Sequence, residues 1–376
     1  MKINYITEAR FPTEKAHGWQ IAKMCEAFAE LGHEVELVIP DRRNTITQTA
    51  QEFYKLKVDF KITRLPVFDA LAIAWLPRLP AFILTEISFL RAVRRWAKTQ
   101  PPGKALAFTR DQFLAHVLRR TDWTRAFEVH DITPRFFWLH KRLARVLDFI
   151  VTTNEWKKRE IEKRWGKRRA KIISLPNAID LVPYRDMPDK AESKKSLGWS
   201  ENKKYVLYTG HLYAWKGVYV LAEASKFLPA DVQIVMVGGT PEDHAHLQTY
   251  LTEHALDKVT LVPHVAHEKL MLYMAAADCY VLPNSAKYWH SLYTTSPIKL
   301  WEYLAARRPL VASDLPSIRE LVNETEVIYV VPDDPQALAR GIDQALRDEP
   351  GKVEAGWTRV SRQTWRSRAE KIMQAV

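Results

Sequence analysis

The stretch from Ser296 to Asp314 combines a helix start with a buried strand, a pattern suited to binding a phosphate group. Ser296 is a favourable N-cap residue and Pro297 suits the first helical position, so a helix with free amide donors is expected here. Such an end attracts anions, because its unpaired N–H groups and the positive end of its dipole point outwards. Glu302, about one and a half turns further on, offers a carboxylate suited to ribose hydroxyls. The alternative is an ordinary capped helix that leads into a parallel strand.

Other residues in the second half of the chain could also contribute to binding a phosphate group. Gly210 and His211 come directly after an apolar run, and Lys216 stands at the start of the next helix. A lysine at a helix start is unfavourable for the helix dipole, and a bound diphosphate would reverse that effect. Phosphate charge would then fall to Lys216, Lys299 and the helix amides that include Ile298.

Four further positions at predicted strand ends could line a ligand. Arg110 and His130 end strands of the first half, and functional groups of open α/β sheets lie at such carboxyl ends. Gly238 follows a strand that meets a glycine turn, and His264 lies in the loop after another strand. A lone glycine pair is weak evidence, and a lone histidine is more often structural.

Alternating strands and helices must position these residues. The opening is a complete β-α-β unit, with a strand at Lys2–Ile6, a loop up to Gly18, a helix over 20–31 and a second strand at Val35–Ile39. The second half repeats this unit. Its strands are expected near 205–210, 232–238, 259–263, 279–283, 309–313 and 327–331.

Length and composition describe a folded protein of two domains. The 376 residues are 47% hydrophobic and 27% charged. Cys25 and Cys279 are predicted to be buried free thiols. The N-terminus goes straight into a strand, and no apolar run is long enough for a membrane span, so a cytoplasmic location is expected.

The excess of positive over negative charge is confined to one half of the chain. Residues 1–180 hold 33 Lys and Arg against 20 Asp and Glu, whereas the remainder holds 23 against 24. Residues 66–103 are rich in aromatic and basic side chains, which fits a helix lying in an anionic membrane interface, and a second basic cluster spans Lys157–Arg169. A helix that faces the core and has a solvated basic face is the alternative.

The motifs together resemble those of the retaining glycosyltransferase family four, which has the GT-B fold. They are the Ser-Pro-x-Lys-x-x-Glu-Tyr run at 296–303, Glu-Val-His-Asp at 128–131, Pro-Asn-Ala-Ile-Asp at 176–180 and the Gly-His…Lys-Gly segment at 210–217. The resemblance implies two Rossmann-like α/β domains that face each other across a cleft. It places the N-terminal acceptor domain at 1–180, a linker at 181–203, the C-terminal nucleotide-sugar domain at 204–350 and a helix at 351–376 that crosses back.

The resemblance also implies roles for individual residues. Glu302 would bind the donor ribose, Lys216 would hold the donor phosphates, His130 would contact the transferred sugar, and Gly18 would allow close approach of the diphosphate or acceptor. Two positions depart from the family pattern. His211 replaces an arginine that is common there, and Thr294 replaces a glutamate.

The resemblance therefore implies retaining, metal-independent transfer of a sugar from a nucleoside-diphosphate sugar, UDP by default and GDP next, to a glycan or lipid-linked acceptor. No cofactor is expected, and an anionic membrane surface on the inner face is a further partner. The two departures leave open a non-catalytic scaffold that binds sugar nucleotides or glycans. A nucleic-acid-binding protein is ranked last, because no reader motif accompanies the basic clusters.

Overall fold

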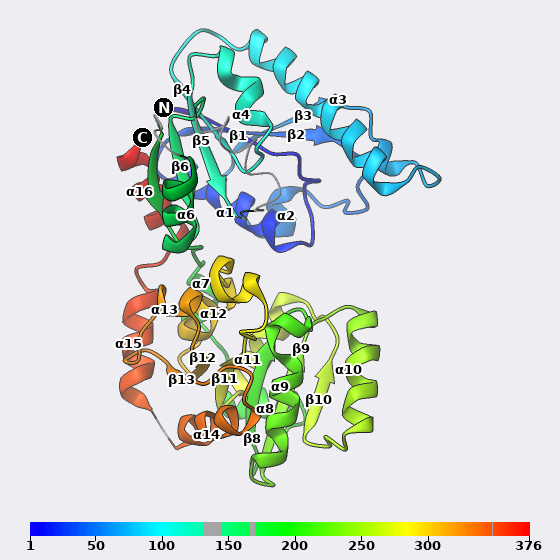
Figure 1. Cartoon of the computed structure of the whole chain (residues 1–376), viewed down its shortest axis with the longest axis vertical. Coiled ribbons are helices and arrows are strands. Elements are labelled where there is room, and N and C mark those ends of the chain that lie inside the picture. The colour runs from blue at the N-terminus through cyan, green and yellow to red at the C-terminus, as the bar shows by residue number, and fades with distance from the viewer. Residues whose placement is uncertain (131, 133–144, 166–169, 348) are drawn as a thin grey trace. The chain divides into compact units, whose positions relative to one another are not determined.

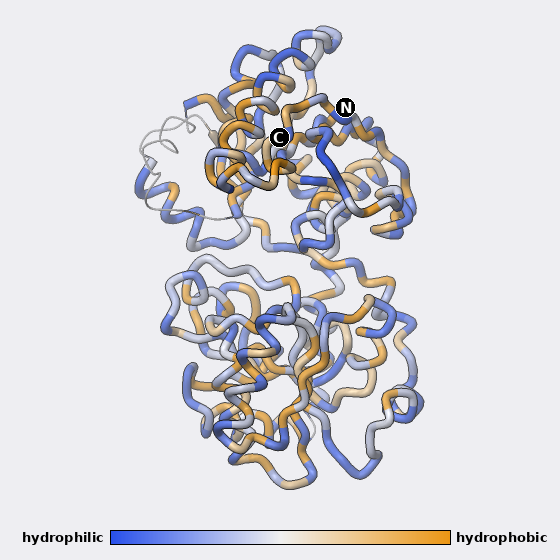
Figure 2. The backbone as a smooth tube through the Cα atoms, turned by 90° about the vertical axis from the view of Figure 1, so that its right-hand side faces the viewer, coloured by the Kyte–Doolittle hydropathy of each residue, from blue (hydrophilic) through white to orange (hydrophobic). Residues whose placement is uncertain are grey.

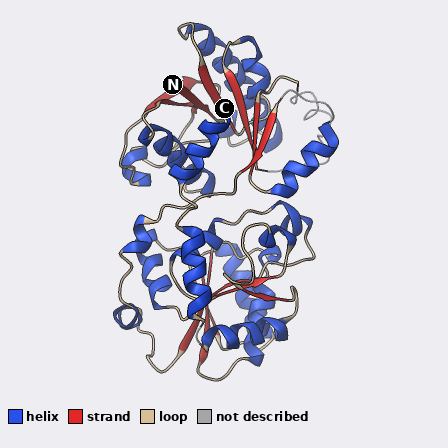
Figure 3. Cartoon of the chain, turned by 90° about the vertical axis from the view of Figure 1, so that its left-hand side faces the viewer, coloured by secondary structure: helices blue, strands red, loops and turns tan. Residues whose placement is uncertain are grey.

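The computed structural model describes residues 1–130, 132, 145–165, 170–347 and 349–376 of the chain, which form two compact units. The first unit comprises Met1–Leu175 together with Trp365–Val376, and the second comprises Pro176–Thr364. In each unit, helices cover a sheet in which all the described strand pairs are parallel (Figures 1 and 3). The repeated βα pattern in the sequence therefore produces the predicted α/β architecture twice.

The first unit holds a seven-stranded sheet in the order β3-β2-β1-β4-β5-β6-β7. The interior strand β1 is buried on both faces, as expected for a parallel sheet covered by helices. On one face Tyr5 lies against Phe108, with 5.1 Å between ring centroids, and Phe28 of α1 packs on Phe108. On the other face Ile6 belongs to the same core cluster as Phe89 and Val93 of α3.

The elements of this unit have the following bounds: β1 Lys2–Ile6, α1 Ala16–Glu30, β2 Glu34–Asp41, α2 Ala50–Tyr54, β3 Lys61–Pro66, the 3-10 turn η1 Ala70–Ala72, α3 Arg78–Thr99, β4 Ala105–Thr109, α4 Leu114–Val117, η2 Leu118–Arg120, β5 Thr124–Val129, β6 Phe149–Thr152, α6 Glu155–Trp165, β7 Lys171–Ser174 and α16 Trp365–Ala375.

The second unit holds a six-stranded sheet in the order β10-β9-β8-β11-β12-β13. Its strands lie within one or two residues of the predicted positions, because each is a short apolar run bounded by turn residues. Figure 2 shows these apolar runs as orange segments of the backbone.

The elements of the second unit are α7 Val182–Arg185, α8 Lys190–Ser196, β8 Lys204–Thr209, η4 Ala214–Lys216, α9 Val218–Ala224, η5 Ser225–Phe227, β9 Val232–Val237, α10 Pro241–Glu253, β10 Val259–Val262, α11 His267–Ala276, β11 Cys279–Leu282, the π-helical turn η6 His290–Thr294, α12 Ile298–Ala305, β12 Leu310–Ser313, α13 Pro316–Arg319, β13 Ile328–Val330, α14 Pro335–Leu346 and α15 Pro350–Val360.

Two segments are organised differently from the expected linker and tail. Residues 181–203 form α7 and α8 within the second unit, where Lys190 and Lys194 both pair with the buried carboxylate of Asp278. The segment 351–376 contains two helices. The first, α15, belongs to the second unit, and the second, α16, belongs to the first unit.

Both cysteines, Cys25 and Cys279, are buried and free, as the sequence predicted. Among the described residues no helix is long and apolar enough to cross a membrane.

Candidate functional site

Glycines bring the backbone close together at the carboxyl ends of β8 and β9. Gly210 follows β8 with φ +113° and Gly238 follows β9 with φ +119°, values that L-residues rarely adopt. A Cβ atom at Gly238 would lie 2.6 Å from the carbonyl oxygen of Gly210, and one at Gly210 would lie 2.7 Å from Nζ of Lys299. Only glycine therefore fits where the two strand ends and the lysine meet.

Two lysines lie in this region, and neither has a carboxylate partner among the residues that the structure describes. Lys299 of α12 donates a short hydrogen bond to the carbonyl oxygen of Thr209, and its Nζ lies 4.1 Å from the ring centroid of Tyr208. Lys216 ends the turn η4, and its Nζ lies 3.7 Å from the ring centroid of Trp215. Within the described part of the chain, neither lysine forms a salt bridge.

Burial lowers the pKa of both lysines, and the charge of Lys216 lowers that of Lys299 further. Burial lowers the pKa of Lys216 to about 7. The pKa of Lys299 is well below its usual value, chiefly through burial and next through the charge of Lys216. An anion bound between the two ammonium groups would remove this repulsion and replace the lost hydration, so the pair is poised for a phosphate.

Glu302 lies about one turn after Lys299 on α12, and burial disfavours its charged form, as it does for this lysine. Burial raises the pKa of Glu302, and Lys299 acts in the opposite direction. The next residue, Tyr303, anchors the helix to the sheet, because its hydroxyl accepts a hydrogen bond of 2.8 Å from the amide of Thr209. The structure thus brings together Lys216, Lys299 and Glu302, which the sequence had singled out separately.

The start of α12 differs from the predicted cap. The helix begins at Ile298 and Pro297 occupies the N-cap position, with no side-chain cap. Ser296 instead accepts a 2.8 Å hydrogen bond at its carbonyl oxygen from Nδ2 of Asn177. Oγ of Ser296 also accepts a 3.5 Å hydrogen bond from the amide of Asn177 and does not cap the helix, so the predicted positions of Ser296 and Pro297 at the helix end were wrong by one residue.

The two histidines near the second-unit site are exposed. The ring of His211 stacks on Tyr213 with 4.8 Å between centroids, and burial lowers the pKa of His211. His264 is close enough to add to that effect. Thr294, which stands where a glutamate was expected, is buried and contacts Nδ1 of His290 at 2.5 Å.

In the first unit, His130 follows β5 and lies beside a buried ion pair. Nε2 of His130 is 3.0 Å from Oε1 of Glu128, and the same oxygen accepts a 2.7 Å hydrogen bond from Arg368 of α16. Burial lowers the pKa of His130 to about 4, with Arg110 contributing in the same direction. The imidazole is therefore neutral near pH 7. Asp131, the last residue of the predicted motif, lies outside the described residues.

Gly18 and Arg110 sit at the carboxyl edge of the same sheet. Gly18 was expected in a loop, but α1 begins at Ala16 and includes it. A Cβ atom at Gly18 would lie 2.3 Å from the hydroxyl of Tyr54, so this glycine permits close packing of α1. Arg110 donates a 3.5 Å hydrogen bond to the carbonyl oxygen of His17.

Sequence reasoning missed two groups in the first unit. Arg368 was expected only as part of the crossing helix at 351–376, and nothing local indicates that it pairs with Glu128, 240 residues away. Glu8, Glu86 and Asp111 form a cluster of carboxyl groups whose oxygens lie within 4.8 Å of one another. Both arrangements depend on which elements the topology makes neighbours.

The fold that positions these residues is that of GT-B glycosyltransferases. Sucrose-phosphate synthase from Thermosynechococcus elongatus matches 99% of this chain and 97% of its own, with a TM-score of 0.75 at 19% identity. Anabaena HepE in complex with UDP matches 100% of both chains, with a TM-score of 0.75 at 16% identity.

Family models match both units. Residues 16–178 match the glycosyl transferase 4-like domain, and residues 203–348 match glycosyl transferases group 1. The chain belongs to the group 1 glycosyltransferases of the GT4 type.

Curated relatives match only part of the chain. The putative teichuronic acid biosynthesis glycosyltransferase TuaC of Bacillus subtilis is 27% identical over 181 residues, which are 48% of this chain and 43% of that protein. The phosphatidyl-myo-inositol mannosyltransferase of Mycobacterium leprae is 29% identical over 228 residues, 57% of this chain and 56% of that protein. The chain thus spans about half the length of the curated relatives it matches.

Proposed function

We propose that this protein is a retaining glycosyltransferase that uses a nucleoside-diphosphate sugar as donor. The observation that carries the proposal is the pair Lys216 and Lys299, two lysines without a carboxylate partner among the described residues, beside the glycine-rich ends of β8 and β9. Such a pair suits a diphosphate, and Glu302 on the same helix suits the ribose hydroxyls. The family assignment supports the same reading of these three residues.

In the proposed reaction, the bond between the anomeric carbon of the sugar and the diphosphate oxygen breaks as a bond from that carbon to the acceptor oxygen forms. The acceptor proton passes to the departing phosphate oxygen on the same face of the sugar, which retains the anomeric configuration. Lys216, Lys299 and the first amides of α12 stabilise the charge that develops on the diphosphate, without a metal ion bridging the donor phosphates.

We assign His130 to the transferred sugar and Gly18, Arg110, Gly210, His211, Gly238 and His264 to donor binding. The neutral imidazole of His130 can donate one hydrogen bond and accept another, which suits a sugar hydroxyl. The contact between His130 and Glu128, braced by Arg368, would orient the ring.

UDP is the proposed donor nucleotide and GDP the next choice. HepE of Anabaena and the pneumococcal O-GlcNAc transferase GtfA, which share the fold, have been solved with UDP. A lipid-linked or glycan acceptor is proposed because relatives are described as a phosphatidyl-myo-inositol mannosyltransferase and a D-inositol 3-phosphate glycosyltransferase.

Donor binding and transfer in variants test the proposal. Thermal shift with UDP, GDP and ADP first identifies the nucleotide. Lys216→Met and Glu302→Gln are then expected to lower donor hydrolysis and transfer by about tenfold to a hundredfold, the range of one lost charge-assisted hydrogen bond. Lys226→Met is the matched control, since Lys226 pairs with Glu223 on the surface of the same unit. Rates equal to those of the control would overturn the assignment.

A non-catalytic scaffold is the second candidate, and His211 and Thr294 are the observations that favour it. His211 stacks on Tyr213 and Thr294 contacts His290, so neither side chain supplies the charge that the family pattern has at its position. A scaffold would bind UDP and show no hydrolysis or transfer against a panel of lipid-linked acceptors. Turnover with any of these acceptors would exclude it.

We also propose that the first unit binds an anionic membrane surface through the start of α3. Phe82, Ile83, Leu84 and Ile87 are exposed on this helix, with the exposed Trp75 just before it. Arg91, Arg94, Arg95 and Lys98 are exposed further along the same helix. Apolar side chains next to cationic ones are typical of helices that lie in a membrane interface.

Some of the residues that the sequence suggested for this membrane-binding surface are buried in the structure. Phe89, Val93 and Trp96, counted as part of the surface, are buried against the core of the unit. Lys157 of the second basic cluster is also buried, with Nζ 2.5 Å from Oγ1 of Thr153. The residues of that cluster at 167–169 lie outside the described part of the chain.

A further inference from the structure

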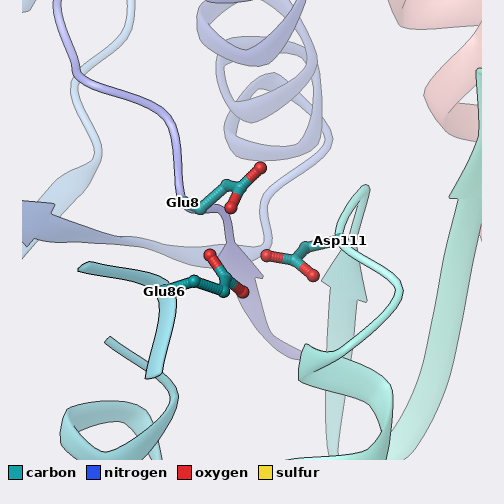
Figure 4. Close-up of side chains that lie close together, drawn as sticks. All are labelled: Glu8, Glu86 and Asp111. Atoms are coloured by element: carbon teal, nitrogen blue, oxygen red, sulfur yellow. The ribbon is translucent and has the colours of Figure 1, made fainter. Parts of the chain in front are cut away.

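A pocket of about 800 Å³ opens in the first unit at the carboxyl ends of β1, β2 and β4. Three carboxyl groups lie together in its wall, those of Glu8, Glu86 and Asp111, and Figure 4 shows them pointing toward one another. Their nearest oxygens all lie within 4.8 Å of one another. The proposed donor residues of the second unit do not contribute to this pocket.

The fold explains why three acids from distant positions meet. β1 and β4 are hydrogen-bonded neighbours that end level, with Ile6 opposite Thr109, so the loops that follow them lie side by side. Glu8 lies in the first loop and Asp111 in the second, where its carboxylate also accepts a 2.8 Å hydrogen bond from the amide of Phe113. Glu86 reaches the same place from the buried face of α3.

Two of the carboxyl groups are buried and incompletely satisfied. Glu86 is 7% exposed and Asp111 is 8% exposed. Oε1 of Glu86 and Oδ2 of Asp111 are buried and have no hydrogen-bond partner among the described residues. Buried polar atoms are nearly always paired, so unpaired oxygens aimed at a shared point indicate a missing partner.

The basic side chains nearby do not supply that partner. Across the described residues, no Lys, Arg or His forms a salt bridge with Glu8, Glu86 or Asp111. Arg10 and Arg42 line the same pocket, but Arg10 pairs with Glu14 at 2.7 Å and Arg42 pairs with Asp69 at 3.2 Å. The cluster therefore concentrates negative charge that only protons or a bound cation can neutralise.

The pKa values of the buried acids are raised, as expected for carboxyl groups that have no positive charge beside them. Burial, and next the neighbouring Glu8, raises the pKa of Glu86 to about 11. Burial and Glu8 likewise raise the pKa of Asp111 to about 6.

We propose that Glu8, Glu86 and Asp111 bind a divalent cation that prefers oxygen ligands, Ca²⁺ or Mg²⁺. The donor set contains carboxylate oxygens alone, which suits these hard cations and not the metals that favour nitrogen or sulfur. Three oxygens around a Ca²⁺ ion at about 2.5 Å would be about 4.3 Å apart, within the observed spacing. The remaining positions face the pocket, where water or the oxygens of a bound ligand complete the coordination.

The cation would tie together three elements whose carboxyl groups otherwise need protons to lie so close together. It would join the loops after β1 and β4 to α3, and so stabilise the wall of the pocket. This inference does not rest on the proposed function, because none of the three carboxyl groups is assigned to the donor or the sugar, although Arg110, which is assigned to the donor, lines the same pocket.

Cation binding to the full chain tests the inference without donor or acceptor. Protein stripped with EDTA and dialysed is titrated with CaCl₂ or MgCl₂ by calorimetry, and its Tm is followed in parallel. We expect saturable binding of one ion of at least one of the two metals, with a rise in Tm. Glu86→Gln and Asp111→Asn are expected to weaken that binding by about tenfold or more, because each removes a charged ligand.

Asp69→Asn is the matched control, since Asp69 lines the same pocket but pairs with Arg42. It should bind the cation as the wild type does. Glu86→Gln is expected to fold, because Gln has nearly the same size and shape as the protonated Glu86 side chain, and its Tm without cation checks this. Absence of binding to the wild type, or equal binding to Glu86→Gln, would overturn the inference. A UDP thermal shift on the same samples reports the proposed function separately.

Discussion

Lys216 and Lys299 show how single residues can be prepared for a ligand that carries the opposite charge. The charge of Lys216 lowers the pKa of Lys299, yet no acid forms a salt bridge with either lysine among the described residues. Two partly desolvated ammonium groups are unfavourable in the free protein. A diphosphate that contacts both would convert this repulsion into two charge-assisted hydrogen bonds.

The low pKa of Lys216 makes donor affinity depend on pH. Below about pH 7 the free protein carries the proton on Lys216, and affinity should be constant. Above that value the free protein loses a proton that the complex keeps, so binding takes up a proton and affinity falls. We expect the Kd of a UDP-sugar to rise by up to about tenfold per pH unit above pH 7, measured by calorimetry from pH 6 to 9.

Lys216→Met provides the control for this pH dependence. It should bind the UDP-sugar more weakly than the wild type at pH 6, and its Kd should change less between pH 7 and 9. A wild-type Kd that stays constant across the whole range would show that Lys216 does not contact the diphosphate.

Packing against the first turn of α1 limits which side chain can stand at position 18. A Cβ atom at Gly18 would lie 2.3 Å from the Tyr54 hydroxyl and 2.5 Å from Cγ2 of Thr13. Gly18→Ala gains at most about 1 kcal/mol from helix propensity, whereas overpacking costs about 1–3 kcal/mol. We therefore expect net destabilisation in urea unfolding. Gly351→Ala in α15, where nothing lies within 4 Å, should be neutral or stabilising. Equal effects of the two changes would contradict this account.

The last helix, α16, contributes a buried charge to the first unit. The side chains of Arg368 and Glu128 are only 1% and 4% exposed, so Arg368→Met leaves the Glu128 carboxylate buried without its arginine. We expect a loss of about 3–5 kcal/mol in the free energy of unfolding, partly recovered by adding Glu128→Gln. Arg366→Met on the same helix removes an exposed pair with Glu370 and should cost less than about 1 kcal/mol.

The Arg368 pair also predicts how stability responds to acid. Burial would raise the pKa of Glu128, but Arg368 and His130 hold it below the ordinary value. Its contribution is therefore complete above the unfolded pKa of about 4.3 and is lost as the pH falls toward the folded pKa. Urea unfolding between pH 3 and 7 should show a smaller loss of stability in acid for Glu128→Gln than for the wild type.

At the scale of the whole molecule, the local sequence pattern was enough to predict the strands of the sheets. It was not enough to predict contacts between distant segments. The strands of the second unit are apolar runs with turn residues at each end, so their positions could be read directly. Ser296 has the local signature of an N-cap, but Asn177, 119 residues earlier, holds it in another role. Gly18 likewise owes its place to Tyr54 of another helix.

The carboxyl cluster is the clearest case of a feature without a sequence signal. Glu8, Glu86 and Asp111 come from two loops and a helix, and no short motif contains two of them. They meet because β1 and β4 are neighbours and α3 covers that face of the sheet. Such a site depends on the order of the strands in the sheet. The spacing of hydrophobic residues in the sequence does not determine that order.

The uneven charge of the chain leads to a prediction about membranes. The first 180 residues carry the excess of Lys and Arg, and α3 exposes apolar side chains in the same unit. We expect the protein to co-sediment with vesicles that contain anionic lipid, to bind neutral vesicles less, and to be released as salt rises, because screening weakens the basic contacts.

Apolar insertion can be separated from this charge attraction. Phe82→Ser with Ile83→Ser removes two exposed apolar side chains of α3 and leaves the charge unchanged, so vesicle binding should fall about tenfold or more. Phe227→Ser is the matched control, because Phe227 is equally exposed but belongs to the second unit. If both variants bind anionic vesicles as the wild type does, α3 does not enter the membrane interface, and the basic surface alone accounts for binding.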